Sequence, residues 1–204
     1  MFRKLAADAL GLSDIGTVIS PSDYDKVDAD DYIMHEDGEK IFFLIKSRSD
    51  EYCFTNMALI HVDGTSAVSK KRTLRRFNFS TNRVANVTLE TAGTVDLDVE
   101  IKFTLGDVSW SIDVHKKHLE QVKDLYKALL AIAQMTYENE HALRFSHQSL
   151  ETATAAMGRV SSREDAPPDQ FAKVNEYAFN WLVNAREKYN VKDFGHVFRR
   201  YLEN

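Results

Sequence analysis

The stretch Val95–Leu105, VDLDVEIKFTL, alternates apolar and polar residues without interruption. Side chains of a β-strand point to opposite faces in turn, so the alternation places every apolar residue of this stretch on one face. These residues are Val95, Leu97, Val99, Ile101, Phe103 and Leu105. Gly106-Asp107, a dipeptide typical of two-residue hairpin turns, comes next, and the alternation resumes at Val108, Trp110, Ile112 and Val114. We therefore predict an antiparallel β-hairpin with one face in a hydrophobic core.

Further strands are expected before this hairpin. Residues 41–45, IFFLI, form a continuous apolar run, which indicates a strand that is covered on both faces or lies where a barrel closes. The segment 52–64, YCFTNMALIHVDG, has two β-prone runs on either side of the turn signal Thr55-Asn56. Together with VANVTLE (84–90), these runs predict an antiparallel meander.

The apolar period changes to that of a helix after the hairpin. A wide apolar stripe recurs at three- and four-residue steps over residues 116–135, and the pattern continues, more polar, toward Met157. After a break at Pro167-Pro168, residues 171–189 form a second amphipathic helix and residues 191–204 a short last segment. Strands and helices in separate runs are typical of the α+β class rather than of a βαβ sheet.

Two of these stretches resemble the bacterial pleckstrin-homology-like (PH-like) domain family. FTNMALIHVDG (54–64) is similar to a family strand that leads into a basic turn, and VTLETAGTVDLDVEIKF (87–103) is similar to a later hairpin. The resemblance implies an α+β fold: a PH-like bent antiparallel β-barrel capped by a C-terminal helix and followed by an α-helical hairpin extension. The resemblance implies the PH-like domain over 20–135 and the helical extension over 136–204. The helical spacing of the apolar residues near the start of the sequence predicts an N-terminal helix or lead-in over 1–19.

The same resemblance also implies how the chain behaves. The family tends to form ring-shaped homo-oligomers and has no established enzymatic activity. The tail at 136–204 resembles the helical hairpin that some members append as an oligomerisation region. The phosphoinositide site of the eukaryotic relatives is not carried over, because no residue of this chain can be matched to it.

Composition places the chain among ordinary soluble globular proteins. The apolar fraction is 44% and the charged fraction 28%, while the net charge of −5 and the pI of about 5.8 argue against a nucleic-acid partner. The single cysteine, Cys53, suits a reducing compartment because it cannot form an intrachain disulfide. The sequence contains no apolar run near the roughly 20 residues that cross a bilayer. We expect a cytoplasmic protein, with attachment to the inner face of the membrane as the alternative.

A basic segment stands out in this acidic chain. It contains five cations within seven residues: Lys70, Lys71, Arg72, Arg75 and Arg76. The cations are candidates to contact an anionic lipid headgroup, an unidentified protein or a neighbouring subunit, and a solvated loop is the simplest alternative. At roughly 1 kcal/mol each on an anionic membrane, five cations would supply only about 5 kcal/mol, which corresponds to sub-millimolar binding.

An acidic row on the predicted hairpin offers a counterpart to the basic segment. Asp96, Asp98 and Glu100 fall on the polar face of the strand, where they are most simply the solvated side of an amphipathic strand. In a ring, however, the basic segment of one subunit would meet the acidic row of the next in a heterologous contact. We therefore treat both sets as candidate contact residues.

Other motifs point away from catalysis. The segment 22–31, SDYDKVDADD, lacks the glycine that a calcium loop needs at its sixth position, where Asp28 stands, so we interpret it as a solvated acidic linker. His115 and His118 are spaced by three, but two histidines beside lysines do not make a zinc site. We find no phosphate-binding loop and no nucleophile elbow. The sequence thus predicts no catalytic residue, no metal and no cofactor.

The tail is the strongest candidate for an interface. Two amphipathic helices cannot easily bury both apolar stripes against each other, so their aromatic residues need the barrel or neighbouring copies. The expected oligomerisation residues are Phe171, Val174, Tyr177, Trp181, Leu182, Phe194 and Phe198. We expect a non-catalytic, self-associating scaffold or binding module. A peripheral membrane adaptor that binds anionic lipid through residues 70–76 is the alternative.

Overall fold

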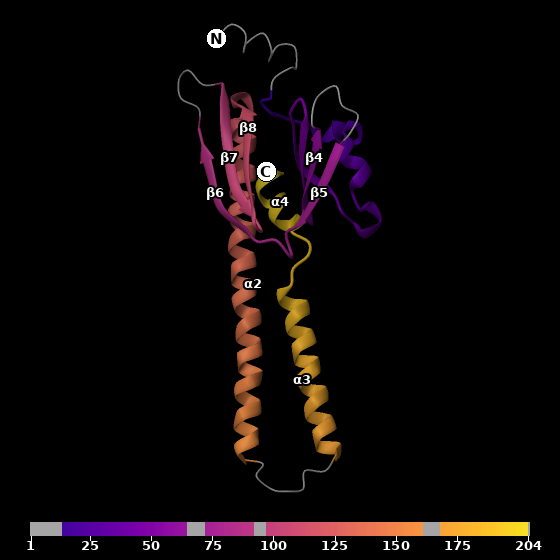
Figure 1. Ribbon diagram of the computed structural model, residues 1–204, viewed down its shortest axis with the longest axis vertical. Helices are drawn as coiled ribbons and strands as arrows, with labels where there is room; N and C mark the ends of the chain where they lie inside the picture. Colours follow the sequence, from indigo (N-terminus) through magenta and orange to yellow (C-terminus); the bar gives the residue numbers. More distant parts are fainter. Residues whose placement is uncertain (1–13, 65–71, 92–96, 161–167, 204) are drawn as a thin grey trace. The chain divides into compact units, whose positions relative to one another are not determined.

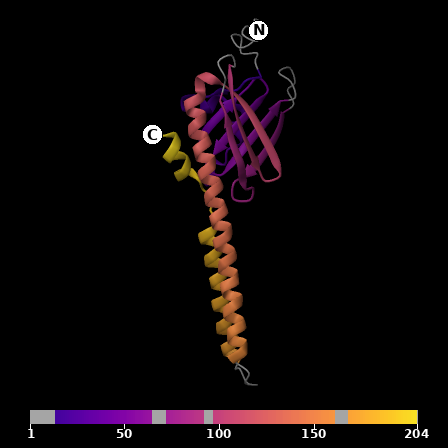
Figure 2. The same cartoon turned by 90° about the vertical axis from the view of Figure 1, so that its left-hand side faces the viewer.

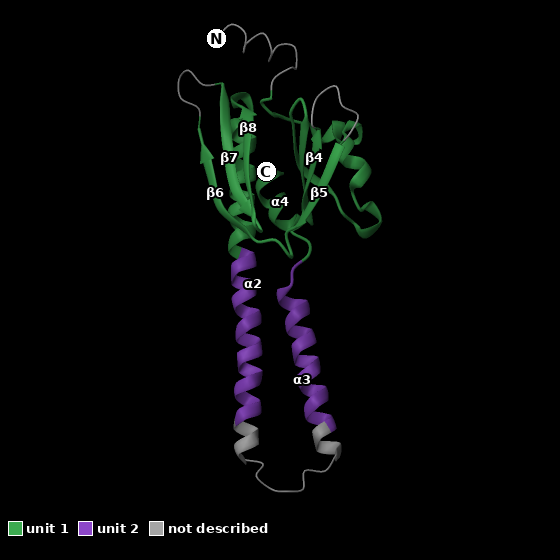
Figure 3. Cartoon of the chain, in the orientation of Figure 1, with its two compact units in different colours: residues 1–134, 192–204 green, residues 135–191 purple. Residues whose placement is uncertain are grey.

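The computed structural model describes residues 14–64, 72–91, 97–160 and 168–203. It confirms the α+β class, because two antiparallel sheets precede a long helix and further C-terminal helices (Figure 1). The chain forms two compact units (Figure 3). Unit 1 comprises residues 1–134 together with 192–204, and unit 2 comprises residues 135–191.

The first sheet of unit 1 contains five strands in chain order among the described residues, and every neighbouring pair is antiparallel. They are β1 (Thr17–Val18), β2 (Ile41–Lys46), β3 (Asp50–Thr55), β4 (Ala58–Gly64) and β5 (Arg72–Asn78). The apolar runs that predicted strands form β2, β3 and β4. The turn predicted at Thr55-Asn56 lies between β3 and β4. The strand β5 forms the edge of the sheet and carries the arginines of the basic segment.

The second sheet contains β6 (Val84–Glu90), β7 (Asp98–Leu105) and β8 (Val108–His115) in that order. The predicted hairpin is confirmed, since β7 and β8 pair without a register shift from Asp98 opposite His115 to Leu105 opposite Val108. Gly106 turns the chain with a φ of 60°, which glycine adopts without steric cost. Along β7 the apolar residues are buried and the residues between them half-buried. Val95 and Asp96 lie outside the described residues.

Gly16 connects the two sheets at one corner. Its N–H donates to the Asp113 carbonyl at 2.8 Å, and its carbonyl accepts from the His115 N–H at 2.9 Å, so the chain before β1 pairs with β8. A Cβ at this position would collide with Ile45 and lie 3.0 Å from the Asp113 carbonyl. Only glycine therefore permits the two sheets to approach here.

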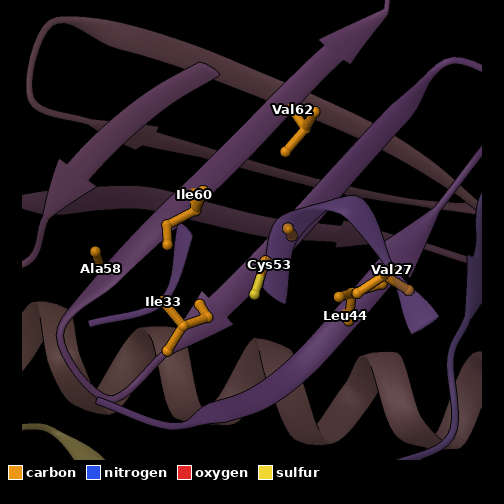
Figure 4. Close-up of a cluster of buried hydrophobic side chains, with 8 residues drawn as sticks. Val27, Ile33, Leu44, Cys53, Ala58, Ile60 and Val62 are labelled. Carbon is orange, nitrogen blue, oxygen red and sulfur yellow. The ribbon is translucent and has the colours of Figure 1, made fainter. Parts of the chain in front are cut away.

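Both faces of the first sheet are covered, as the apolar run of β2 suggested. On one face, Leu44 packs with the segment between β1 and β2, which forms the 3-10 helices η1 (Pro21–Lys26), η2 (Asp28–Tyr32) and η3 (His35–Asp37) (Figure 4). The buried cluster on this face is Val27, Ala29, Ile33, Leu44, Cys53, Ala58, Ile60 and Val62. The interpretation of residues 22–31 as a solvated linker is therefore corrected: the carboxylates stay at the surface, but the apolar residues between them cover the sheet.

The opposite face of the first sheet contacts the second sheet through aromatic rings. Phe43 meets Phe54 edge to face at 6.4 Å between ring centroids, and Phe54 lies 6.1 Å from Phe103 of β7. Trp110 of β8 stacks beside Phe103 at 6.3 Å. Because β2 is packed on both faces, nearly all of its residues must be apolar.

Helices complete both units. A turn of 3-10 helix, η4 (Lys116–His118), leads into α2 (Leu119–Val160), and α3 (Pro168–Tyr189) and α4 (Gly195–Leu202) follow (Figures 1 and 2). Of the predicted stripe, α2 buries Val122, Leu125, Leu129 and Ile132 within unit 1, whereas Leu130 is 41% exposed. Ala128, which the prediction did not include, is also buried. The second amphipathic helix of the prediction is α3.

The C-terminal segment differs from the expectation, which placed it in the helical extension. Residues 192–204 belong to unit 1, where α4 contacts β2. Phe198 stacks on Phe42 at 5.5 Å and lies 6.1 Å from Phe79, while Phe194 meets Phe79 edge to face at 6.0 Å. Phe194 and Phe198 are fully buried inside the chain, so in this conformation neither ring is free to contact a neighbouring copy.

Candidate interaction surfaces

Three arginines of the basic segment lie on β5, and their surroundings differ. Lys70 and Lys71 lie outside the described residues. Arg72 donates to the Ser49 carbonyl at 3.2 Å and lies 3.4 Å from an oxygen of Asp28. The side chain of Arg75 is exposed and has no ion-pair partner within the described ranges. Leu74, between them, is 42% exposed. The edge strand thus presents charge and apolar surface together.

Arg76 is already engaged inside unit 1. Its Nη1 donates to the Oε2 atom of Glu39 at 2.9 Å, and its Nε donates to Asn78 at 2.8 Å. The Glu39 side chain is fully buried and also accepts from the Thr55 hydroxyl at 2.5 Å and from the Met34 N–H at 2.9 Å. This arginine therefore neutralises a buried carboxylate and is a poor candidate for an external partner.

The protonation of Glu39 reflects two opposed effects. Burial alone would raise the pKa of the carboxyl group, whereas the hydrogen bonds from Arg76 and Thr55 lower it, and the net pKa lies below the ordinary value. The effect of the hydrogen bonds on the pKa outweighs that of burial, because the bonds stabilise the charged carboxylate directly. Glu39 is thus a structural anion that holds η3, β3 and β5 together.

The acidic row on β7 is also partly neutralised within the chain. Glu100 accepts hydrogen bonds from Ser111 and from Lys102, and these bonds lower the pKa of its carboxyl group. Lys102 also pairs with Glu90 at 2.7 Å. Asp98 is half-buried on the same strand, and Asp96 lies outside the described residues. Among the described acids of this row, Asp98 remains the better candidate for a contact with a neighbouring subunit.

The Thr55-Asn56 turn anchors the C-terminal segment. The Asn56 side chain donates to Asp193 at 2.9 Å, and its backbone carbonyl accepts from the Phe194 N–H at 2.7 Å. The same side chain accepts from the Lys40 N–H at 2.7 Å. The FTN part of the family resemblance therefore has a structural explanation: Thr55 closes the turn and binds Glu39, and Asn56 fixes the start of α4.

Unlike Glu39, the side chains of Tyr52 and Cys53 in unit 1 are held neutral by burial. Burial raises the pKa of Tyr52 to about 12, and its ring stacks on His61 at 4.7 Å between centroids. Burial likewise raises the pKa of the Cys53 thiol, which is fully buried. A neutral, shielded thiol packs well but is not an activated nucleophile.

The predicted oligomerisation residues of the hairpin fall on one side of α3. Tyr177 is 65% exposed, its ring lies 6.3 Å from that of Trp181, and Val174 is exposed one turn before. We call Val174, Tyr177 and Trp181 the α3 patch. Leu182 is half-buried beside it. The side chain of Phe171 lies outside the described residues.

Three further aromatic side chains of the hairpin are exposed and were missed by the sequence reasoning. Phe145 on α2 is 61% exposed, Phe179 on α3 is 64% exposed, and Tyr137 on α2 is also exposed. They lie off the apolar stripes that defined the two helices. The signal that would have found two of them is the four-residue spacing of Tyr137, His141 and Phe145, which places these side chains on one helix face.

Two further properties of the described residues bear on function. They contain no group of three or more His, Cys, Asp and Glu side chains placed to hold a metal ion. In the ranges that the structure covers, no helix is long and apolar enough to cross a membrane.

Comparison with family descriptions agrees with the two-part architecture. Residues 9–133 match the family described as "Bacterial PH domain". Residues 144–204 match the "YvbH-like oligomerisation region". The second match covers α3, α4 and most of the hairpin part of α2, so it includes both the exposed α3 patch and the buried α4.

Similar proteins extend over nearly the whole chain. The uncharacterized protein YvbH of Bacillus subtilis (strain 168) is 56% identical over 204 residues, which is 100% of both chains. A crystal structure of a PH domain containing bacterial protein from Exiguobacterium sibiricum 255-15 is 51% identical and has a TM-score of 0.86. That comparison covers 93% of this chain and 100% of the other. The chain therefore belongs to the family of bacterial PH-domain proteins that carry a C-terminal YvbH-like oligomerisation region.

Proposed function

We propose that the protein is a non-catalytic scaffold that joins several copies through its helical hairpin and displays their PH-like domains. The observation that carries the proposal is the α3 patch. It exposes large apolar side chains on a helix within the region that matches an oligomerisation family. Exposed rings next to one another on a helix are typical of a surface that a partner covers.

The energy available from the hairpin is sufficient for association. Fully burying an aromatic or large aliphatic side chain contributes roughly 1.5–3 kcal/mol. The α3 patch with Phe145 and Phe179 amounts to several such groups per chain, and each contact buries groups on two chains. This gain offsets association costs of several kcal/mol.

We further propose that the oligomer is a ring in which β5 of one subunit faces β7 of the next. Arg75 supports this arrangement, because it is exposed and has no ion-pair partner within the described ranges, and Asp98 lies on the acidic row of the second sheet. Arg76 and Glu100 contribute less, since both are paired inside the chain. The charge contact sets orientation, while the hairpin supplies most of the binding energy.

The test is the mass of the full chain in solution, measured by light scattering at about 10 μM. We expect an oligomer, and we expect the double variant Val174→Ser/Tyr177→Ser to be a monomer because it loses the α3 patch. Asn180→Ser, an exposed polar change on the same helix, should leave the mass unchanged. A monomeric wild-type chain would refute the scaffold.

Exposed Leu74, with Arg72 on the same face of the edge strand β5 and Arg75 on the opposite face, favours a second candidate, a peripheral membrane adaptor, because an apolar residue next to cations suits an anionic bilayer surface. Co-sedimentation with vesicles separates the two functions. An adaptor binds phosphatidylglycerol vesicles at low salt and loses binding in Arg75→Gln, whereas the scaffold stays in the supernatant.

A further inference from the structure

The hairpin part of α2 carries a row of neighbouring aromatic rings. Tyr137 and His141 are 4.1 Å apart between ring centroids, and His141 and Phe145 are 6.4 Å apart. Arg144 extends the row: it lies over the Phe145 ring at 5.8 Å and 2.9 Å from His141 Nδ1. We call Tyr137, His141 and Phe145 the α2 ladder.

The α2 ladder faces away from α3. The Trp181 Nε1–H donates to the Ser146 carbonyl at 3.2 Å, so the α3 side of α2 lies near Ser146. Leu143 and Leu150 are half-buried on that side. With 3.6 residues per turn, Tyr137 and His141 lie more than 130° around the helix from Ser146, and Phe145 lies about 100° from it. The ladder is therefore a second apolar surface, separate from the α3 patch.

The two surfaces differ in shape. The ladder is a single file of rings along one helix, which forms a ridge. The α3 patch lies beside the line where the two helices meet, because Trp181 reaches across to α2. A helix ridge packs into the groove between two neighbouring helices, and the exposed rings of both surfaces would then be covered together.

We propose that the α2 ladder of one copy packs against the α3 patch of a second copy of this chain. This inference rests on the proposed scaffold function and specifies its interface. The occupant is another copy because the α3 patch and Phe145 lie within the match to an oligomerisation region, and the ladder continues that surface back to Tyr137, seven residues before the match begins.

A contact between two different surfaces is heterologous, so each chain has one neighbour on either side. Such contacts generate closed rings or open chains rather than two-fold dimers. The hairpin alone therefore specifies the head-to-tail order that a ring requires.

A mixing experiment tests the inference with two variants of the full chain. The ladder variant is Tyr137→Ser/Phe145→Ser, and the patch variant is Val174→Ser/Tyr177→Ser. Each alone should be monomeric where the wild type assembles, with a dissociation constant raised about 100-fold or more by the loss of two large apolar side chains. Native mass spectrometry of an equimolar mixture should show one-to-one dimers, because the intact ladder of the patch variant meets the intact patch of the ladder variant. The two substituted surfaces remain at the outside of this dimer and cannot bind a third subunit.

The outcomes separate this inference from the scaffold function. If the ladder variant assembles like the wild type while the patch variant is monomeric, the ladder contact is refuted and the scaffold stands. Homodimers of either variant, or a monomeric mixture, also refute the heterologous contact. A monomeric wild-type chain refutes both. The control is His147→Ser, an exposed substitution on α2 outside the ladder. Circular dichroism checks that each variant keeps its helix content. If the double ladder variant unfolds, the single variant Phe145→Ser replaces it.

Discussion

A single buried carboxylate shows how individual residues hold the PH domain together. Glu39 receives hydrogen bonds from Arg76, Thr55 and the Met34 backbone, so its charge is balanced within unit 1. The pKa of Glu39 is lowered on folding from its ordinary value of 4.5. The charged form therefore stabilises the fold at pH values above about 4.5, and this stabilisation is lost as the pH falls through the folded-state pKa.

We predict that Glu39→Gln lowers the free energy of unfolding at pH 7 by about 3 kcal/mol, because Arg76 loses its buried partner. The variant should also lose less stability than the wild type between pH 7 and pH 3, since it has no carboxylate to protonate. Urea denaturation at several pH values measures both effects. Glu36→Gln, at an exposed neighbouring position, is the control. Parallel pH profiles for Glu39→Gln and the wild type would contradict the assignment.

At the scale of elements, α4 is the helix whose packing is hardest to predict from the sequence pattern. It closes the apolar site formed by Phe42 and Phe79, and Asn56 fixes its start. A chain cut at Gln134 would lose α4 together with the hairpin. A change in oligomer mass after such a truncation would therefore not distinguish loss of the hairpin interface from damage to the PH domain.

We predict that Phe198→Ala lowers the free energy of unfolding by about 3–5 kcal/mol, because it leaves a cavity in the core of unit 1. The oligomer mass should not change under conditions where the chain remains folded. Thermal unfolding and light scattering on the same samples test this. A fall in mass without a loss of stability would instead support the oligomerisation role that the sequence suggested for Phe198.

At the scale of the whole molecule, charge and apolar surface have different roles in the proposed oligomer. The apolar surfaces of the hairpin would supply most of the binding energy, and Arg75 on the edge strand β5 would orient the subunits. Because the Arg75 side chain is exposed, its contribution depends on ionic strength and is at most about 1 kcal/mol.

We predict that Arg75→Glu weakens assembly about fivefold at low salt and has little effect at about 0.5 M salt, because screening removes the contact. Sedimentation velocity at both salt concentrations tests this. Arg48→Glu changes the net charge equally at another exposed site and is the control. Equal effects of the two variants would show that only net charge matters. Arg76 is unsuitable for this test, since its replacement also breaks the pair with Glu39.

Much of the fold was predictable because its signals are local. The alternation of β7 and β8, the Gly106 turn and the stripes of α2 and α3 depend on residues that are near one another in sequence. The exposed side chains of the α3 patch were predictable for the same reason. The α2 ladder was missed because it lies outside the apolar stripe by which a helix is recognised.

The amino-acid sequence by itself determined the class of the fold, the order of its elements and a hairpin with more apolar surface than two helices bury. Only the tertiary structure decided which apolar and charged residues remain available. Phe194 and Phe198 are buried in the core of unit 1, and Arg76 forms an ion pair with Glu39. The physical reason is that periodicity reports which face of an element is apolar, whereas burial depends on which distant segment covers that face.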